Sequence, residues 1–177
     1  MITTIVKVRG FEKISKEQYL QDMNSLNINS RILSKEQILE CYNNIKLPRR
    51  ATKKSSGYDF YSPLKFKLHP NEIIKIPTGI KATMKQNEEL KIFVRSSMGF
   101  KYNIRLCNQV GKIDSDYYNN ESNEGHIWIA LKNEGNKSWI VKVGDGIAQG
   151  SFYNYLITDD DIPISEERIG GIGSTGK

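Results

Sequence analysis

Apolar residues from Leu47 onward occur in short runs that often alternate with polar residues. Such runs cover residues 73–76, 80–84, 90–94, 127–131, 139–143 and 147–152. Gly, Asn, Pro and Asp separate the runs, and these residue types favour turns. Many short strands joined by turns are typical of a sandwich, a jelly roll or a closed barrel. Residues 1–9, with Val6 and Val8 on one face, predict a further opening strand.

Residues 11–45 have a different pattern. The sequence SKEQ occurs at 15–18 and again at 34–37. This is the capping box, in which serine caps the third helical amide and glutamine bonds back to the serine amide. Apolar residues at helical spacing follow each box, so we expect two short helices. The residues after the two boxes do not match further, and we infer no repeat.

The composition is that of one globular domain over residues 1–177. Cys41, Cys107, His69 and His126 occur singly, which makes a zinc site or a disulfide framework improbable and favours a reducing, cytoplasmic location. The most apolar run has five residues, too few to span a membrane, and the first ten residues lack the pattern of a secretory signal.

The net charge is +6, from 26 Lys and Arg against 20 Asp and Glu. A basic chain favours anionic partners, but the charge does not choose between nucleic acid and a small phosphorylated ligand. A solvated basic surface without a partner explains the charge equally well.

Three polar motifs carry candidate chemistry. Arg95, Ser96 and Ser97 follow a predicted strand and suit phosphate oxygens, although a capped turn would have the same residues. Asp114 and Asp116 share strand parity and could face one site, or they could end an ordinary polar hairpin. The sequence GIGSTG at 171–176 offers main-chain N–H groups and hydroxyls to an anion, but it lacks the spacing of a Walker loop.

Taken together and in order, these segments resemble the trimeric dUTPase family. Five stretches match: ATKKSSGYDFYS (51–62), RSSMGFK (95–101), NQVGKIDSDYY (108–118), GDGIAQ (144–149) and RIGGIGSTG (168–176). The third is the most specific. Five matches in the family's order over residues 51–176 leave little room for chance.

The resemblance implies an all-β, distorted jelly-roll or β-clip subunit with a small helical insertion at 11–45. It also implies a homotrimer whose active sites lie between subunits and are closed by a flexible C-terminal arm, residues 168–177. The implied reaction is hydrolysis of dUTP to dUMP and diphosphate with Mg²⁺ on the triphosphate. No membrane or nucleic-acid partner is expected.

The family's residue roles fall on matching positions of this chain. Asp114 would be the general base that activates water for attack on the α-phosphorus. Tyr117 would lie under the deoxyribose, where its ring leaves no room for a 2′-hydroxyl. Trp128 either lines this site or is a core aromatic. Asn108 and the main chain of Gly111, Lys112 and Ile113 would read the uracil edge.

The remaining roles concern the triphosphate. Arg95 and Ser96 of the RSS element, beside Ser97, would bind phosphate oxygens together with Gln149, Arg168, Ser174 and Thr175. Asp59 and Gln149 would hold waters of the Mg²⁺ shell, because Mg²⁺ keeps several waters when phosphates bind it.

The chain departs from the family pattern at several positions. Gly146 replaces the usual arginine of the fourth motif, which removes a charge and predicts a looser turn. Ile172 replaces the phenylalanine that usually stacks on uracil, and Arg168 lies one residue closer to the glycines than usual. The sequence NNESNEG at 119–125 lengthens the loop after the third motif. We therefore expect an intact hydrolytic centre with altered base stacking and lid closure.

Two other functions remain as alternatives. A dCTP deaminase shares the RSS element, but it carries a glutamate where this chain has Ala130. A regulatory member of the family would bind a protein partner, and residues 11–45 offer a surface that catalysis does not require. These helices could equally be packed decoration that covers a sheet edge, which we favour.

Overall fold

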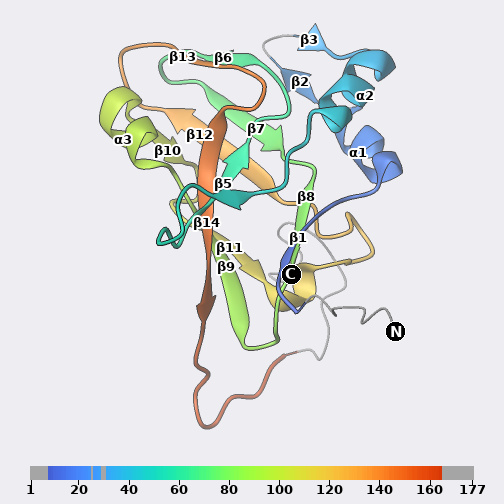
Figure 1. Cartoon of the computed structure of the whole chain (residues 1–177), viewed down its shortest axis with the longest axis vertical. Helices are drawn as coiled ribbons and strands as arrows, with labels where there is room; N and C mark the ends of the chain where they lie inside the picture. The colour runs from blue at the N-terminus through green and yellow to red at the C-terminus, as the bar shows by residue number, and fades with distance from the viewer. Residues whose placement is uncertain (1–7, 25, 29–30, 165–177) are drawn as a thin grey trace.

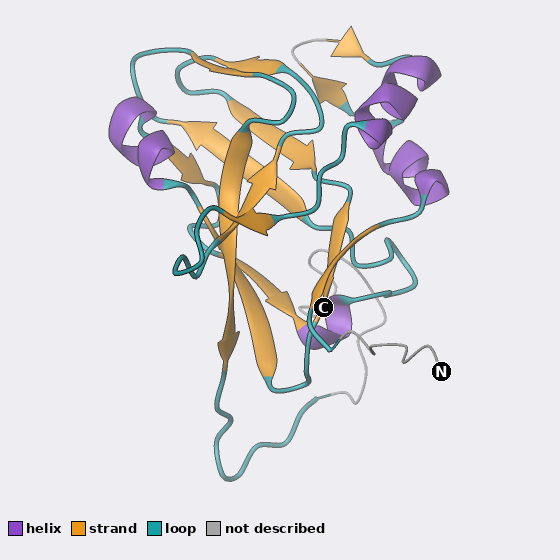
Figure 2. Ribbon diagram, in the orientation of Figure 1, coloured by secondary structure: helices purple, strands orange, loops and turns teal. Residues whose placement is uncertain are grey.

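The computed structural model describes residues 8–24, 26–28 and 31–164. These residues form mostly β structure with few helices, as the sequence predicts (Figures 1 and 2). The strands are β1 (Gly10–Lys13), β2 (Asn27–Ile28), β3 (Arg31–Ile32), β4 (Arg49–Arg50), β5 (Tyr58–Tyr61), β6 (Phe66–Leu68), β7 (Ile73–Pro77), β8 (Ile80–Thr83), β9 (Glu88–Phe93), β10 (Ile104–Leu106), β11 (Gly111–Asp114), β12 (Trp128–Asn133), β13 (Trp139–Val141) and β14 (Gly146–Asn154). The helices are α1 (Lys16–Met23), α2 (Lys35–Asn43), α3 (Ser96–Tyr102) and the 3₁₀ turn η1 (Ser115–Tyr117).

The largest sheet has the strand order β11-β9-β14-β5-β4. Its neighbouring strands are antiparallel, and β14 lies between β9 and β5 (Figure 1). A second sheet has the order β10-β12-β7, and the pairs β1-β8, β6-β13 and β2-β3 complete the pairing among the described residues. Phe60, Leu90 and Ile147 from the large sheet and Ile76 and Leu131 from the second are fully buried, so both sheets contribute to one core.

The two predicted helices form after the two SKEQ sequences. Tyr19 and Met23 of α1 and Ile38 and Cys41 of α2 are buried in the same core as the strands. The helices pack on each other, and α1 packs on β7. This burial agrees with packed decoration, since the apolar faces of both helices are covered by the body of the protein.

The opening strand differs from its prediction. Val8 and Arg9 form a bend, and the strand begins only at Gly10, where β1 pairs with β8. Residues 1–7 lie outside the described residues. The six runs predicted as strands correspond to β7, β8, β9, β12, β13 and β14, with no end shifted by more than two residues.

Candidate active site

Strand β14 brings together residues from the first, second and fourth motifs. Gln149 lies opposite Asp59 of β5 on one side and Phe93 of β9 on the other. Two residues beyond Phe93, Arg95 turns toward β5, and its Nε lies 3.0 Å from Asp59 Oδ1. Gln149 Nε2 donates a hydrogen bond of 3.1 Å to the Val94 carbonyl. Three side chains predicted from separate motifs are therefore neighbours.

Two glycines make room for these side chains. A Cβ on Gly57 would lie 2.7 Å from Gln149 Oε1, and a Cβ on Gly146 would overlap the Arg95 guanidinium. Arg95 also donates a long hydrogen bond of 3.4 Å from Nη1 to the Gly146 carbonyl. The guanidinium thus occupies the space that a side chain at position 146 would need.

Sequence reasoning missed this partnership between Arg95 and Gly146. It predicted a looser turn than in the family, which stays a prediction. In this turn Asp145 accepts a 2.8 Å hydrogen bond from the Lys142 amide, and Gly144 donates one of 2.8 Å to the Ser62 carbonyl. The replacement of a large charged residue by glycine in the fourth motif was the available signal. It shows that space becomes free, but not which side chain fills it.

Arg95 is the N-cap residue of α3, and Ser96 and Ser97 lie exposed in its first turn. The sequence predicted a polar end of a strand here and missed the helix. Arg95 makes no capping hydrogen bond with its side chain, which leaves that side chain free to reach Asp59. Ser96 and Ser97 follow Arg95 directly in the sequence, and hydroxyls beside a guanidinium are donors that suit phosphate oxygens.

The third motif forms β11, which pairs with the opposite edge of β9. A turn precedes it, in which Val110 donates to the Asn108 carbonyl at 2.7 Å and Gln109 has a positive φ of 65°. Gly111 lies opposite Ile92, where a Cβ would come 3.1 Å from the Ile92 Cβ. Glycine at this position therefore lets β11 lie close against the Ile92 side chain of β9.

Asp114 lies opposite Glu89, at the other end of β9 from Arg95 and Gln149. Its carboxylate is 39% exposed and lies 3.6 Å from Lys112 Nζ. Gln149 is opposite Phe93, four residues further along β9, so the two positions are offset by about 13 Å along the strand. The structure of one chain does not bring the predicted base to the predicted phosphate-binding residues.

Tyr117 ends η1 and is buried. Its hydroxyl donates a 3.0 Å hydrogen bond to the His126 carbonyl and accepts one of 2.9 Å from Asn123 Nδ2. Trp128 lies on β12 opposite Pro77, half-buried, with its ring centroid 5.4 Å from that of His126. Trp128 belongs to the second sheet rather than to the sheet that carries Asp114. Its predicted place, either in the lining of the site or in the core, stays a prediction.

The oxygen donors available for a cation are few. Among residues 8–24, 26–28 and 31–164, no group of three or more His, Cys, Asp or Glu side chains could hold a metal ion. Asp59 and Gln149 together offer one carboxylate and one amide oxygen. Such a set suits an ion that is held mainly by water and a phosphorylated ligand, which is how Mg²⁺ usually binds.

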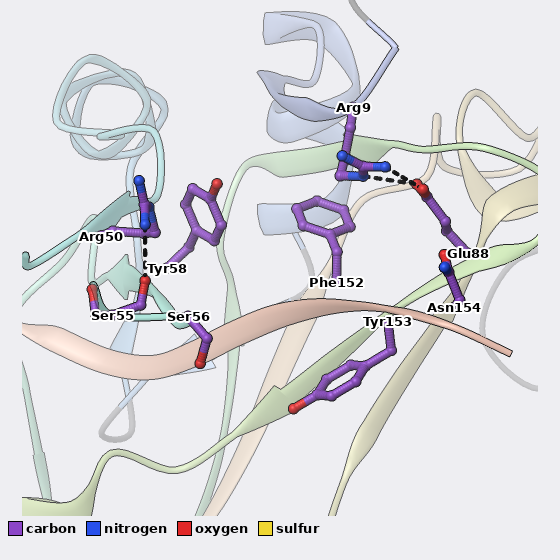
Figure 3. A pocket seen from close by; sticks show the side chains of 9 residues that line it. All are labelled: Arg9, Arg50, Ser55, Ser56, Tyr58, Glu88, Phe152, Tyr153 and Asn154. Carbon is purple, nitrogen blue, oxygen red and sulfur yellow. Dashed lines mark hydrogen bonds and ion pairs between the residues drawn. The ribbon is translucent and has the colours of Figure 1, made fainter. Parts of the chain in front are cut away.

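A separate pocket of about 340 Å³ lies beside the first motif (Figure 3). Arg9 in this pocket pairs with Glu88, and Arg50 donates hydrogen bonds of 3.1 Å and 2.8 Å to the carbonyls of Ser55 and Lys53. Both guanidinium groups are thus engaged by the protein itself. The pocket contains none of the predicted site residues.

Four predicted site residues, Arg168, Ile172, Ser174 and Thr175, lie outside the described residues, together with the rest of the predicted arm. Their roles stay predictions.

Comparison with known proteins gives a consistent result. The dUTPase family model matches residues 43–176. The deoxyuridine 5′-triphosphate nucleotidohydrolase of Lactococcus lactis is 42% identical over 122 residues, which cover 68% of this chain and 81% of that protein. The one from Desulfitobacterium hafniense is 35% identical over 128 residues, with the same shares of both chains.

The solved structures that resemble this chain are also dUTPases. The crystal structure of dUTPase from Streptococcus mutans matches with a TM-score of 0.64 and 34% identity, covering 85% of this chain and 98% of that one. A dUTPase of Staphylococcus bacteriophage 80alpha shares the fold, with a TM-score of 0.62 at 17% identity over 92% of this chain and 100% of that one.

Proposed function

This chain belongs to the dUTPase family, and we propose that it hydrolyses dUTP to dUMP and diphosphate. The observation that carries the proposal is the meeting of Asp59, Arg95 and Gln149 around β14, three polar residues from three separate family motifs. A guanidinium, an amide and two nearby serine hydroxyls are donors that suit phosphate oxygens.

In the proposed reaction, Asp114 accepts a proton from a water molecule that attacks the α-phosphorus in line with the leaving diphosphate. Its carboxylate is partly exposed at the edge of the sheet, so water and substrate can reach it. The Lys112 Nζ lies 3.6 Å from this carboxylate. Products are dUMP and diphosphate, with the water oxygen on the α-phosphate.

The uracil and the deoxyribose of the substrate would bind around β11. Main-chain N–H and C=O groups of Gly111, Lys112 and Ile113, with Asn108, match the donors and acceptors of the uracil edge. The ring of Tyr117 would lie against the deoxyribose and exclude a 2′-hydroxyl by bulk. This arrangement makes the enzyme selective for dUTP over UTP.

We propose Mg²⁺ as the cofactor, carried by the triphosphate with Asp59 and Gln149 on its water shell. The ion would neutralise phosphate charge during attack. With substrate absent, Arg95 neutralises the Asp59 carboxylate. With the triphosphate bound, the same guanidinium can contact a phosphate oxygen instead.

The site would be completed between subunits of a homotrimer. Asp114 and Gln149 are offset by about 13 Å along β9, which is large for two groups that act on one triphosphate. A neighbouring subunit that supplies one of the two sets would remove this offset. The arm residues Arg168, Ile172, Ser174 and Thr175 would close the site in the cytoplasmic enzyme.

The test is diphosphate release from dUTP, UTP, dTTP and dCTP, each with and without Mg²⁺. We expect release from dUTP with Mg²⁺ and little from the other three nucleotides. Ammonia release from dCTP would instead indicate the deaminase alternative. Position 130 on β12 carries alanine and offers no carboxylate for that reaction.

The predicted base has its own test in Asp114→Asn. The substitution keeps the size of the side chain and removes its ability to accept a proton, so kcat should fall by about 100- to 10,000-fold. Binding of a non-hydrolysable dUTP analogue, measured by calorimetry, should stay within a few-fold of the unmodified protein. Near-normal turnover in this variant would exclude Asp114 as the base.

A further inference from the structure

The lengthened loop after the third motif encloses the hydroxyl of Tyr117. Residues 119–125 are joined by several hydrogen bonds of their own, among them Asn119 N–H to the Glu124 carbonyl at 3.1 Å. The Tyr117 hydroxyl donates to the carbonyl of His126 at 3.0 Å and accepts from Asn123 at 2.9 Å. Asn120 Nδ2 donates to the Tyr117 carbonyl at 2.9 Å. The position of this ring is therefore fixed by the loop.

The same loop is anchored to the N-terminal helical segment at its other side (Figure 1). Glu124 accepts hydrogen bonds from the amide and the hydroxyl of Ser15, at 2.8 Å and 2.6 Å. Ser15 is the N-cap residue of α1, so the carboxylate takes the bond that a capping-box glutamine would supply. Tyr118 extends the anchor by donating to Glu12 at 2.7 Å.

The strongest anchor is made by His126, whose side chain is fully buried. Its Nε2 accepts a 2.8 Å hydrogen bond from the Gly79 amide, and its Nδ1 lies 2.5 Å from Asp22 Oδ2. Because Gly79 donates to Nε2, the proton of the neutral ring is on Nδ1 and is donated to Asp22. One imidazole thus joins the α1 helix, the β7–β8 turn and the backbone that holds the Tyr117 hydroxyl.

We propose that Asp22 and His126 are positioning residues for Tyr117, so that the N-terminal helical segment sets the enzyme's discrimination between deoxyribose and ribose. The proposal rests on the proposed dUTP hydrolysis. Neither residue contacts substrate. Asp22 fixes the imidazole, the imidazole fixes the main chain at 126, and that carbonyl fixes the phenol.

A ring that excludes a hydroxyl by bulk must be held in place, because a small shift opens the space again. Rigid packing and hydrogen bonds prevent such a shift. The buried bonds from Asp22 to Tyr117 supply this rigidity beside the lengthened loop at 119–125. In this proposal the helical segment covers apolar surface and also holds the Tyr117 ring in place.

A double-mutant cycle tests the proposal. Asp22→Asn keeps the size of the side chain but weakens the bond to His126, while Tyr117→Phe keeps the ring and removes its two hydroxyl bonds. The measured quantity is the ratio of kcat/KM for dUTP to kcat/KM for UTP in the unmodified protein, both single variants and the double variant. The matched control is Glu36→Gln, which removes one negative charge from an exposed position of α2, where the carboxylate accepts a hydrogen bond from the Ser34 hydroxyl.

We expect Asp22→Asn to lower the dUTP-to-UTP ratio by about two- to thirtyfold, the range for substitutions that act through intervening residues. The double variant should lose little more than the more affected single variant, because both changes break the same chain of contacts. Glu36→Gln should keep the ratio. Glu124→Gln, which weakens the Ser15 anchor but leaves the serine cap in place, should lower the ratio as well and provides a second variant if Asp22→Asn does not fold.

The outcomes separate the two proposals. An unmodified protein without preference for dUTP would refute the proposed function. An unmodified protein that prefers dUTP, with an unchanged ratio in Asp22→Asn and Glu124→Gln, would refute only the positioning role. Losses that multiply in the double variant would also refute it, since independent effects add in free energy. A purely structural role would lower the melting temperature without changing the ratio.

Discussion

Arg95 contacts residues of two other motifs at once, and its position shows what a single residue contributes to the site. Its guanidinium lies 3.0 Å from the Asp59 carboxylate and above Gly146. The three positions are far apart in the sequence. The resemblance to the family predicted that Arg95 and Asp59 belong to one site, because both lie in matching motifs. It could not predict that a glycine would hold the arginine in place, since that depends on packing between distant segments.

Gly146→Ala tests this arrangement. The new Cβ would overlap the guanidinium, which is the flexible end of its side chain and can move away. We therefore expect a change in unfolding free energy below about 1 kcal/mol, as for other changes that a flexible neighbour absorbs. The kcat/KM for dUTP should fall at least about tenfold, because a donor to the transition state typically contributes about 100- to 1,000-fold and is displaced here rather than removed.

Gly99→Ala is the matched control for the backbone effect. No heavy atom lies within 4 Å of a Cβ at this position in α3, so it measures what the loss of a glycine does to stability without a steric clash. Alanine in a helix is more favourable than glycine by about 0.5–1 kcal/mol. If Gly146→Ala left kcat/KM unchanged, the Arg95 position seen here would not be the one used in catalysis.

At the scale of elements, the two SKEQ sequences show where local sequence stops deciding structure. Both predict helices and both form them. At Ser34 the capping box is complete, with Gln37 bonded back to the serine amide. At Ser15 the matching glutamine instead donates to Asp22, and Glu124 bonds to the serine amide. Identical tetrapeptides differ because a tertiary partner is present at only one of them.

Two physical reasons explain the elements that the sequence did not predict. Strands β6, β10 and β11 have three or four residues each, too short for an alternating pattern to be distinguished from a turn. Helix α3 begins at Ser96 after Arg95, which is not a preferred N-cap residue and makes no side-chain cap. Longer strands with clear alternation, such as β12, were predicted within a few residues.

The buried bond between Asp22 of α1 and His126 predicts a pH dependence of stability. Burial lowers the pKa of His126, against the opposing effects of Asp22 and Glu124. A protonated ring would also turn Nε2 into a donor facing the Gly79 amide. The unfolded state therefore binds a proton more readily, and the stabilisation is present above the unfolded pKa. It should be lost as pH falls below about 6.5, by up to about 1.4 kcal/mol per pH unit.

Urea unfolding at several values between pH 5 and pH 8 measures this effect. His126→Gln supplies the comparison, because its amide oxygen can accept from Gly79 and does not titrate. The difference in unfolding free energy between the two proteins should shrink as pH falls from 7 to 5. Carboxylates such as Glu124, whose pKa is kept low by hydrogen bonds from Ser15 and by Lys81 despite burial, titrate at lower pH. A constant difference would show that His126 does not titrate on unfolding.

At the scale of the molecule, the large sheet separates two parts of the candidate site. Strand β9 has Asp114 beside its first half and Gln149 beside its end. The resemblance predicted a site between subunits, and the offset along β9 gives that prediction a geometric reason in a single chain. No helix of the described residues is long and apolar enough to span a membrane. What one sequence cannot reveal is which subunit supplies which residues, since that depends on contacts between chains.

Subunit complementation tests the shared site. Asp114→Asn removes the proposed base, and Arg95→Ala removes the guanidinium proposed to bind phosphate, so each variant alone should be nearly inactive. If the two residues come from different subunits, random mixing in a trimer leaves some sites with both residues intact. A mixed trimer contains two chains of one variant and one of the other, and in either case one of its three shared sites pairs an intact Asp114 with an intact Arg95. About a third of the sites in mixed trimers should therefore be active.

The experiment requires that the two variants exchange subunits, which co-expression with two different affinity tags allows. Tandem purification then selects mixed assemblies, and diphosphate release from dUTP is compared with that of the unmodified protein and of each variant purified alone. A doubly substituted chain, Asp114→Asn with Arg95→Ala, co-expressed with unmodified chain is the control for subunit exchange. Activity no higher than that of the separate variants would mean that one chain supplies both residues. In that case Asp114 and Arg95 would have to approach each other within a chain, and the offset of about 13 Å along β9 would have to be overcome by a rearrangement of the sheet.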